Sequence, residues 1–151
     1  MIREFVESIL LARSQAISRR DPDKDWLLQL EMLKAALASS KTGDIQIESL
    51  NGLEIGFFMF DVATDGERYC LGRLEGDDVV LTRDGRVELL FEHRRFEVSK
   101  TIEAFVTGMA QLDALMYRHY PVRPLSDAEV SELAKVFGGI GAESFICWTA
   151  G

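Results

Sequence analysis

Residues 51–91 read NGLEIGFFMFDVATDGERYCLGRLEGDDVVLTRDGRVELLF, in which short apolar runs alternate with turn signals. The turn signals lie at 51–52, 63–66, 75–78 and 84–85, and each pairs glycine with asparagine, aspartate or glutamate. Connections this short join antiparallel strands, because a parallel crossover needs about a dozen residues. Together with the alternating residues 45–49, this spacing predicts a continuous antiparallel meander over 45–91, and a sheet of five or six strands.

Residues before the meander have helical periodicity. Apolar side chains recur at i, i+3, i+4 and i+7 over residues 2–18, which predicts an amphipathic helix. Residues 21–23, DPD, supply a capping oxygen, a proline suited to the first helical turn, and an acid near the positive end of the helix dipole. They predict a second helix that ends at about Ser39.

Helical patterns return after the meander. A long amphipathic helix is expected over residues 99–117, with Ser99 or Thr101 as its N-cap, and residues 126–129 form a capping box at the start of a shorter helix. The apolar tail 144–148 is expected to dock as a short strand or to pack on the core. The predicted fold class is therefore α+β: two N-terminal helices, the antiparallel meander, and two C-terminal helices, with at least one face of the sheet covered.

Length and charge limit the function classes. The chain has 151 residues, of which 47% are hydrophobic, and this predicts one α+β domain over 1–151. The net charge of −8 makes direct binding to nucleic acid or to an anionic membrane unexpected. The N-terminus lacks the uninterrupted apolar region of a signal peptide, and there is no run of 18 apolar residues. We therefore expect a cytoplasmic protein with no membrane partner.

Few residues suggest catalysis or metal binding. His93 and His119 are too far apart in sequence to indicate a metal site, and no nucleophile motif or phosphate-binding glycine loop is present. The sequence therefore predicts no enzyme activity, no metal and no cofactor. Cys70 and Cys147 have apolar neighbours, which favours buried free thiols, although a single disulfide stays open. Residues 92–95, EHRR, are interpreted as a solvated loop or as local ion pairs rather than as a nucleic-acid contact.

An acidic segment within the meander stands out. Residues 61–78 contain six acids and two arginines, and most of the acids fall at strand ends and turns. Turns at one end of a meander lie close together, so two interpretations are open: the acids serve solubility, or they form a patch that attracts a basic protein partner. The candidate partner-binding residues are Asp61, Asp65, Glu67, Glu75, Asp77 and Asp78.

Residues 53–117 carry several motifs in a recognisable order. The motifs are FFMF at 57–60, DG at 65–66, YCL at 69–71, DGRV at 84–87 and VSKTIEAFV at 98–106. This order resembles the core of SUKH-superfamily bacterial immunity proteins, in which a meander with a D-G turn leads into a closing helix. The resemblance implies an α+β protein without enzymatic activity that binds and neutralises a co-encoded toxin, often a nuclease. A basic toxin would suit an inhibitor with a charge of −8.

Two other functions remain as alternatives. Small acidic α+β proteins also resemble type III secretion chaperones, which hold an effector segment in extended form. Their usual order is helix, three strands, helix, two strands, helix, and it differs from two leading helices followed by consecutive strands. The third alternative is a small-ligand-binding or enzymatic domain. The identity of the partner, the contact residues and the oligomeric state stay open.

Overall fold

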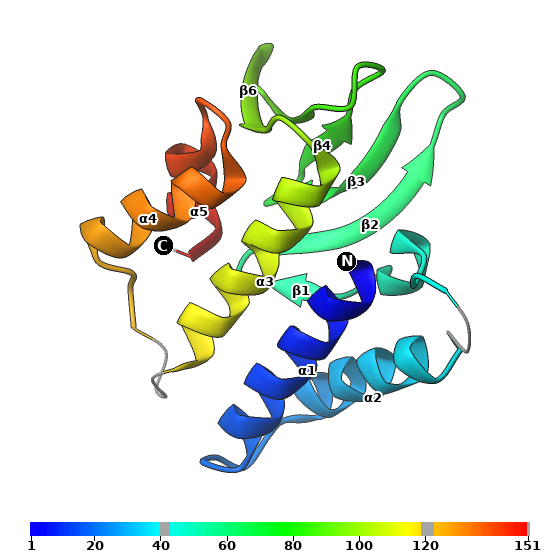
Figure 1. Cartoon of the computed structure of the whole chain (residues 1–151), viewed down its shortest axis with the longest axis vertical. Coiled ribbons are helices and arrows are strands. Elements are labelled where there is room, and N and C mark those ends of the chain that lie inside the picture. The colour runs from blue at the N-terminus through cyan, green and yellow to red at the C-terminus, as the bar shows by residue number, and fades with distance from the viewer. Residues whose placement is uncertain (40–42, 119–122, 151) are drawn as a thin grey trace.

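The computed structural model describes residues 1–39, 43–118 and 123–150. Its sheet has six strands in the order of the sequence, and every neighbouring pair is antiparallel, so the predicted antiparallel meander is confirmed from residue 54 onward (Figure 1). The strands are β1 (Glu54–Ile55), β2 (Phe58–Thr64), β3 (Tyr69–Leu74), β4 (Asp77–Leu81), β5 (Val87–Phe91) and β6 (Arg94–Ser99).

Two α-helices precede the sheet and three follow it among the described residues, so the α+β class is confirmed with one C-terminal helix more than predicted. The second helix begins at Lys24, so the expected proline in its first turn is wrong: Pro22 precedes the helix, and Asp23 caps it by accepting a hydrogen bond from the backbone N–H of Trp26 at 2.9 Å. Thr101 rather than Ser99 caps the third helix. The helices are α1 (Ile2–Ile17), α2 (Lys24–Ser39), α3 (Ile102–Arg118), α4 (Asp127–Phe137) and α5 (Ala142–Ala150).

The core lies between the helices and one face of the sheet, across which α3 runs (Figure 1). Buried phenylalanine rings join the elements there. Phe58 of β2 packs edge-on against Phe105 of α3 with ring centroids 5.8 Å apart, and Phe105 packs in the same way against Phe137 of α4 at 6.1 Å. These tilted arrangements suit the quadrupoles of the aromatic rings and add to the free energy gained by burying them.

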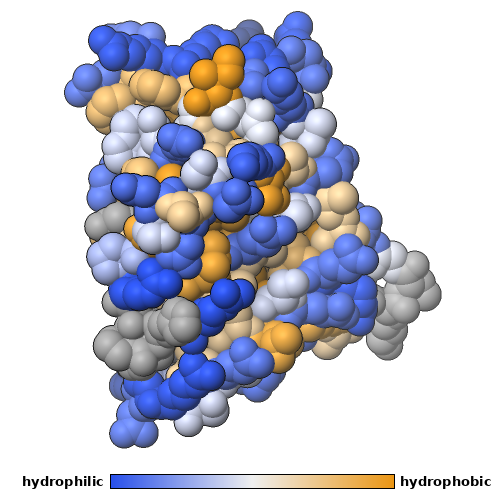
Figure 2. Space-filling model, turned by 60° about the vertical axis from the view of Figure 1, so that its left-hand side comes forward, coloured by the Kyte–Doolittle hydropathy of each residue, from blue (hydrophilic) through white to orange (hydrophobic). Residues whose placement is uncertain are grey.

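The surface around α4 and α5, which comes forward in Figure 2, is mainly hydrophilic. Its hydrophobic residues form small, separated groups. Single exposed apolar residues of this kind are normal on a folded protein.

The beginning of the meander differs from the prediction. Residues 45–49 do not form a strand; residues Ile47–Leu50 form a 3₁₀ helix, η1, instead. The predicted strand 53–60 is divided between β1 and β2 by a tight turn at Gly56 and Phe57. Gly56 has φ +60°, and the Phe57 N–H donates to the carbonyl oxygen of Thr149 at 3.0 Å, which fixes this turn against α5.

The prediction of a solvated loop at 92–95 was wrong in part, because Arg94 begins β6. Glu92 and His93 form a two-residue turn between β5 and β6, with φ values of 46° and 65°. Hairpins of this kind usually place asparagine, aspartate or glycine at positions with positive φ. Neither residue belongs to that group, so the turn had no signal in the sequence.

The C-terminal tail packs on the core as predicted, but as helix α5 rather than a strand. Phe145 and Ile146 are fully buried on it, whereas Cys147 is exposed and Cys70 of β3 is half-buried. Both cysteines are free thiols, so the prediction of free thiols is confirmed and that of burial is wrong. Residues 40–42, which follow the predicted end of the second helix at about Ser39, and Pro121, which lies between the two predicted C-terminal helices, are outside the described residues.

Candidate functional site

The face of the sheet that points away from the helices, here called the outer face, is the candidate site. Side chains alternate along β2, where Phe58 and Phe60 are buried under the helices while Met59 is 37% exposed. The side chains of Arg73 on β3 and Arg95 on β6 are more than half exposed. The outer face therefore has solvent-exposed side chains that a ligand or a protein partner could contact.

A hollow of about 460 Å³ lies on the outer face beside the β1–β2 and β3–β4 turns. Two large apolar side chains line this hollow, those of Phe57 and Met59, and Phe57 is 57% exposed. We call this region the Phe57 hollow. Its lining residues are Glu54, Gly56, Phe57, Met59, Arg73, Glu75 and Gly76.

Acids dominate the charge around the Phe57 hollow. Arg73 forms an ion pair with Asp61 on β2 and lies opposite Asp78 on β4. Glu54 and Glu75 also line the hollow, so four carboxylates and one guanidinium lie at it or beside it. Burial raises the pKa of the nearby Cys70 thiol, and the carboxylates of Asp78 and Asp61 raise it further. The field at this end of the outer face is negative.

The structure brings only some of the six predicted acids together. Asp61, Glu75 and Asp78 lie around the Phe57 hollow, whereas Asp77 lines a separate hollow with Leu74, Leu89 and Trp148. Asp65 and Glu67 lie at the opposite end of β3, which at about 3.3 Å per residue is roughly 20 Å away. The expected single cluster of acidic turns is therefore wrong, because consecutive turns of a meander lie at opposite ends.

Asp65 has a local structural role. Its Oδ1 accepts hydrogen bonds from the backbone N–H groups of Glu67 at 3.0 Å and Arg68 at 2.8 Å. These bonds hold the β2–β3 turn and keep the pKa of the Asp65 carboxyl below its usual range. The negative charge of Asp65 is thus tied to the turn.

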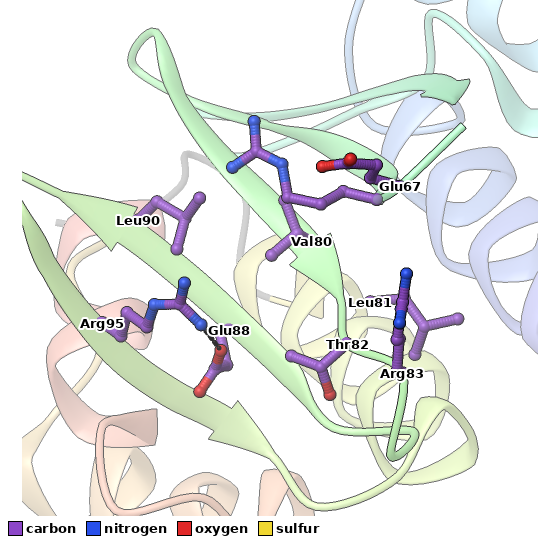
Figure 3. A pocket seen from close by; sticks show the side chains of 9 residues that line it. Glu67, Val80, Leu81, Thr82, Arg83, Glu88, Leu90 and Arg95 are labelled. Carbon is purple, nitrogen blue, oxygen red and sulfur yellow. Dashed lines mark ion pairs between the residues drawn. The ribbon is translucent and has the colours of Figure 1, made fainter. Parts of the chain in front are cut away.

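A second hollow, of about 270 Å³, occupies the other half of the outer face (Figure 3). Glu88 of β5 lies at it between two arginines: its Oε2 is 3.2 Å from a nitrogen of Arg86, and its Oε1 is 3.5 Å from a nitrogen of Arg95. Arg86 also reaches Glu97, directly across from Glu88, at 3.4 Å. The expected local ion pairs near 92–95 are present. The sequence contained no sign of the hollow, because it joins residues from three strands, β4 to β6, and from the β2–β3 and β4–β5 turns.

Within the described part of the chain, no group of three histidine, cysteine, aspartate or glutamate side chains could hold a metal ion. His119 lies outside that part, and His93 is in the exposed β5–β6 turn. None of the described helices is long and apolar enough to cross a membrane.

The chain matches no family model, no curated protein and no solved structure. The SUKH-like order of its motifs therefore stays a prediction.

Proposed function

We propose that this chain is a non-enzymatic, immunity-type protein that binds a co-encoded bacterial toxin in the cytoplasm and neutralises it. The observation that carries the proposal is the Phe57 hollow, where the exposed apolar side chains of Phe57 and Met59 lie in one lining with Glu54 and Glu75. The SUKH-like order of motifs in residues 53–117 supports the same function.

The Phe57 hollow suits a basic protein as its occupant. Apolar side chains at the centre of an interface contribute most of the binding free energy, and Phe57 and Met59 would lose their exposed area on contact. The surrounding carboxylates would attract a basic partner, such as a nuclease, and orient it. An acidic or neutral partner would leave these carboxylates desolvated without compensation.

The chemistry of the outer face supports binding rather than catalysis. Cys70 lies on β3, and the raised pKa of its thiol keeps it protonated and weakly nucleophilic at neutral pH. Its neighbours Asp61 and Asp78 favour the protonated thiol still further. Inhibition by steric cover of a toxin requires no reactive group.

The type III secretion chaperone is the weaker alternative. Those chaperones place a helix between their strands, whereas β1 to β6 follow one another without an intervening helix. The uninterrupted meander favours the immunity-type interpretation.

The test uses the product of the neighbouring gene. The two proteins are co-expressed, the complex is isolated by size-exclusion chromatography, and its dissociation constant is measured by calorimetry. We expect a stable complex in which the neighbour's toxic activity is blocked. The double variant Phe57→Ser/Met59→Ser should weaken binding at least about tenfold, because it removes the apolar centre of the interface.

Ile140→Ser is the matched control, since Ile140 is 95% exposed in the α4–α5 connection and lies away from the hollow. This variant should bind as tightly as the parent protein. Absence of a complex with the neighbouring product, or equal weakening in both variants, would contradict the proposal.

A further inference from the structure

The second hollow of the outer face is lined by more basic than acidic side chains. Three arginines and two glutamates line it, although the chain carries a net charge of −8. The arginines come from different places: Arg68 precedes β3, Arg83 lies in the β4–β5 turn, and Arg95 is on β6. Only the folded meander brings them to one hollow, which we call the arginine hollow.

The buried glutamate offsets one of these arginines. Glu88 has a side chain only 6% exposed, and its two oxygens face Arg86 and Arg95 respectively. Arg86 also forms ion pairs with Asp84 at 2.8 Å and with Glu97 at 3.4 Å, so the positive charge left in the lining is that of Arg68 and Arg83. In Figure 3 the Arg95 guanidinium extends toward Glu88, so Glu88 positions Arg95 as one wall of the hollow.

Two arginines keep donors available for a ligand. Arg83 is exposed and forms no ion pair with any residue that the structure describes. The Arg68 side chain forms one ion pair, in which its Nε is 3.7 Å from Asp65. The side chains of Arg68 and Asp65 are each more than half exposed. Exposed ion pairs of this length contribute little free energy, so a better acceptor would displace Asp65.

Apolar side chains complete the arginine hollow. Val80 and Leu90 lie on neighbouring strands, next to Glu88, and Val80 is only 4% exposed. A fully solvated inorganic ion would gain nothing from this surface, whereas a flat or aliphatic group would be buried on it. At about 270 Å³ the hollow is slightly smaller than typical pockets for drug-sized ligands, which start at about 300 Å³.

We propose that the arginine hollow binds a small organic carboxylate, with the carboxylate at Arg68 and Arg83 and the apolar body on Val80 and Leu90. Guanidinium groups suit this ligand because their parallel N–H donors match the two oxygens of a carboxylate. Glu67 stands at the rim and disfavours a second negative charge on the ligand. This binding site is independent of the Phe57 hollow and of any toxin.

The probe is benzoate, titrated into ¹⁵N-labelled protein at an ionic strength held constant with sodium chloride. We expect saturable shifts of the backbone amides near residues 67–69, 80–83 and 88–90. Acetate should bind more weakly because it lacks the apolar body, and inorganic phosphate more weakly still. Benzamide, which has the same ring without the charge, should cause no saturable shift.

Arg83→Gln should weaken benzoate binding at least about fivefold without altering the fold, because Arg83 has no ion pair to lose among the described residues. Arg94→Gln is the matched control: it removes the same charge from β6, but Arg94 does not line the hollow. Equal weakening by both variants, equal binding of benzamide, or no saturable shift with benzoate would overturn the proposal.

Discussion

Glu129 accepts hydrogen bonds from Arg123 at 2.8 and 3.1 Å, and one from the backbone N–H of Ser126 at 3.0 Å. These donors, Arg123 first, lower the pKa of the Glu129 carboxyl from 4.5 to about 2. Because this pKa is lower in the folded than in the unfolded chain, ionised Glu129 stabilises the fold above about pH 4.5. That contribution is lost as the pH falls through about 2.

An NMR titration of the side-chain carboxyl should give a midpoint near pH 2 for Glu129, and Arg123→Gln should move that midpoint up toward 4.5. In Glu129→Gln, this part of the acid dependence of unfolding should vanish. A midpoint near 4.5 in the parent protein would show that the Arg123 contact does not persist in solution.

Gly108 allows α3 to approach α4 closely. A Cβ atom at this position would lie 2.7 Å from ring atoms of Phe137, which is fully buried. Gly108→Ala should therefore destabilise the protein by about 1–3 kcal/mol despite the better helix propensity of alanine, because the ring has to move in a packed core. Thr107→Ala, at the exposed neighbouring position, should be neutral or slightly stabilising; chemical denaturation compares the two, and equal stability would contradict the close packing.

At the scale of the elements, one buried ion pair joins the N-terminal helices to the rest of the fold. Arg13 of α1 is 2.9 Å from Asp113 of α3, with side chains 4% and 0% exposed, and it also donates to Gln29 of α2 and to the carbonyl oxygen of Glu54 in β1. Burial raises the pKa of the Asp113 carboxyl, and the charge of Arg13 opposes that rise. The pair therefore depends on both partners being present.

Asp113→Ala should cost about 3–5 kcal/mol of unfolding free energy, because it leaves the Arg13 charge buried without its counter-ion. Replacing both residues, as in Arg13→Met/Asp113→Leu, should restore much of that loss. Glu7→Ala breaks the exposed pair with Arg3 at 3.1 Å and should cost less than about 1 kcal/mol. A small loss in Asp113→Ala, measured by denaturant unfolding, would show that water reaches Arg13.

The predictable elements are those whose signals are local. The helical spacing of α1 to α4 lies within each segment, and so do the caps of α2 to α4, such as the Ser126–Glu129 capping box. Residues 144–148 are too short an apolar run to separate a strand from a helix. In the fold, the N–H groups of Gly139 and Gly141 donate hydrogen bonds to the carbonyl oxygens of Val98 and Glu97 on the edge of β6. These carbonyls therefore already have partners, and the tail forms a helix instead of a strand paired with β6.

For the whole molecule, the candidate site was only partly predictable. The sequence identified the acids and the meander, and alternation of the turns would have placed Asp65 and Glu75 at opposite ends of β3. The Phe57 hollow was hidden because its turn at Gly56 lies within one apolar run, 53–60. The arginine hollow depends on which residues of three strands and two turns share the outer face, and this follows from register and bulges rather than from composition.

The separation of the acids leads to a kinetic prediction that rests on the proposed toxin partner. The two ends of β3 are roughly 20 Å apart, well beyond the screening length of about 8 Å at physiological salt, so each group of acids acts separately. Glu75→Gln/Asp78→Asn, beside the Phe57 hollow, should slow association at low salt at least about threefold and flatten its salt dependence. Asp65→Asn/Glu67→Gln removes the same charge at the other end of β3, so the association rate of this variant should change little. The amide introduced at position 65 keeps an oxygen that can accept the hydrogen bonds of the turn.

Stopped-flow measurements of the association rate at low and moderate salt, on variants with unaltered melting transitions, compare the two double variants. Equal slowing by both pairs would assign the effect to net charge alone, and no slowing by either would remove the acids from the recognition surface.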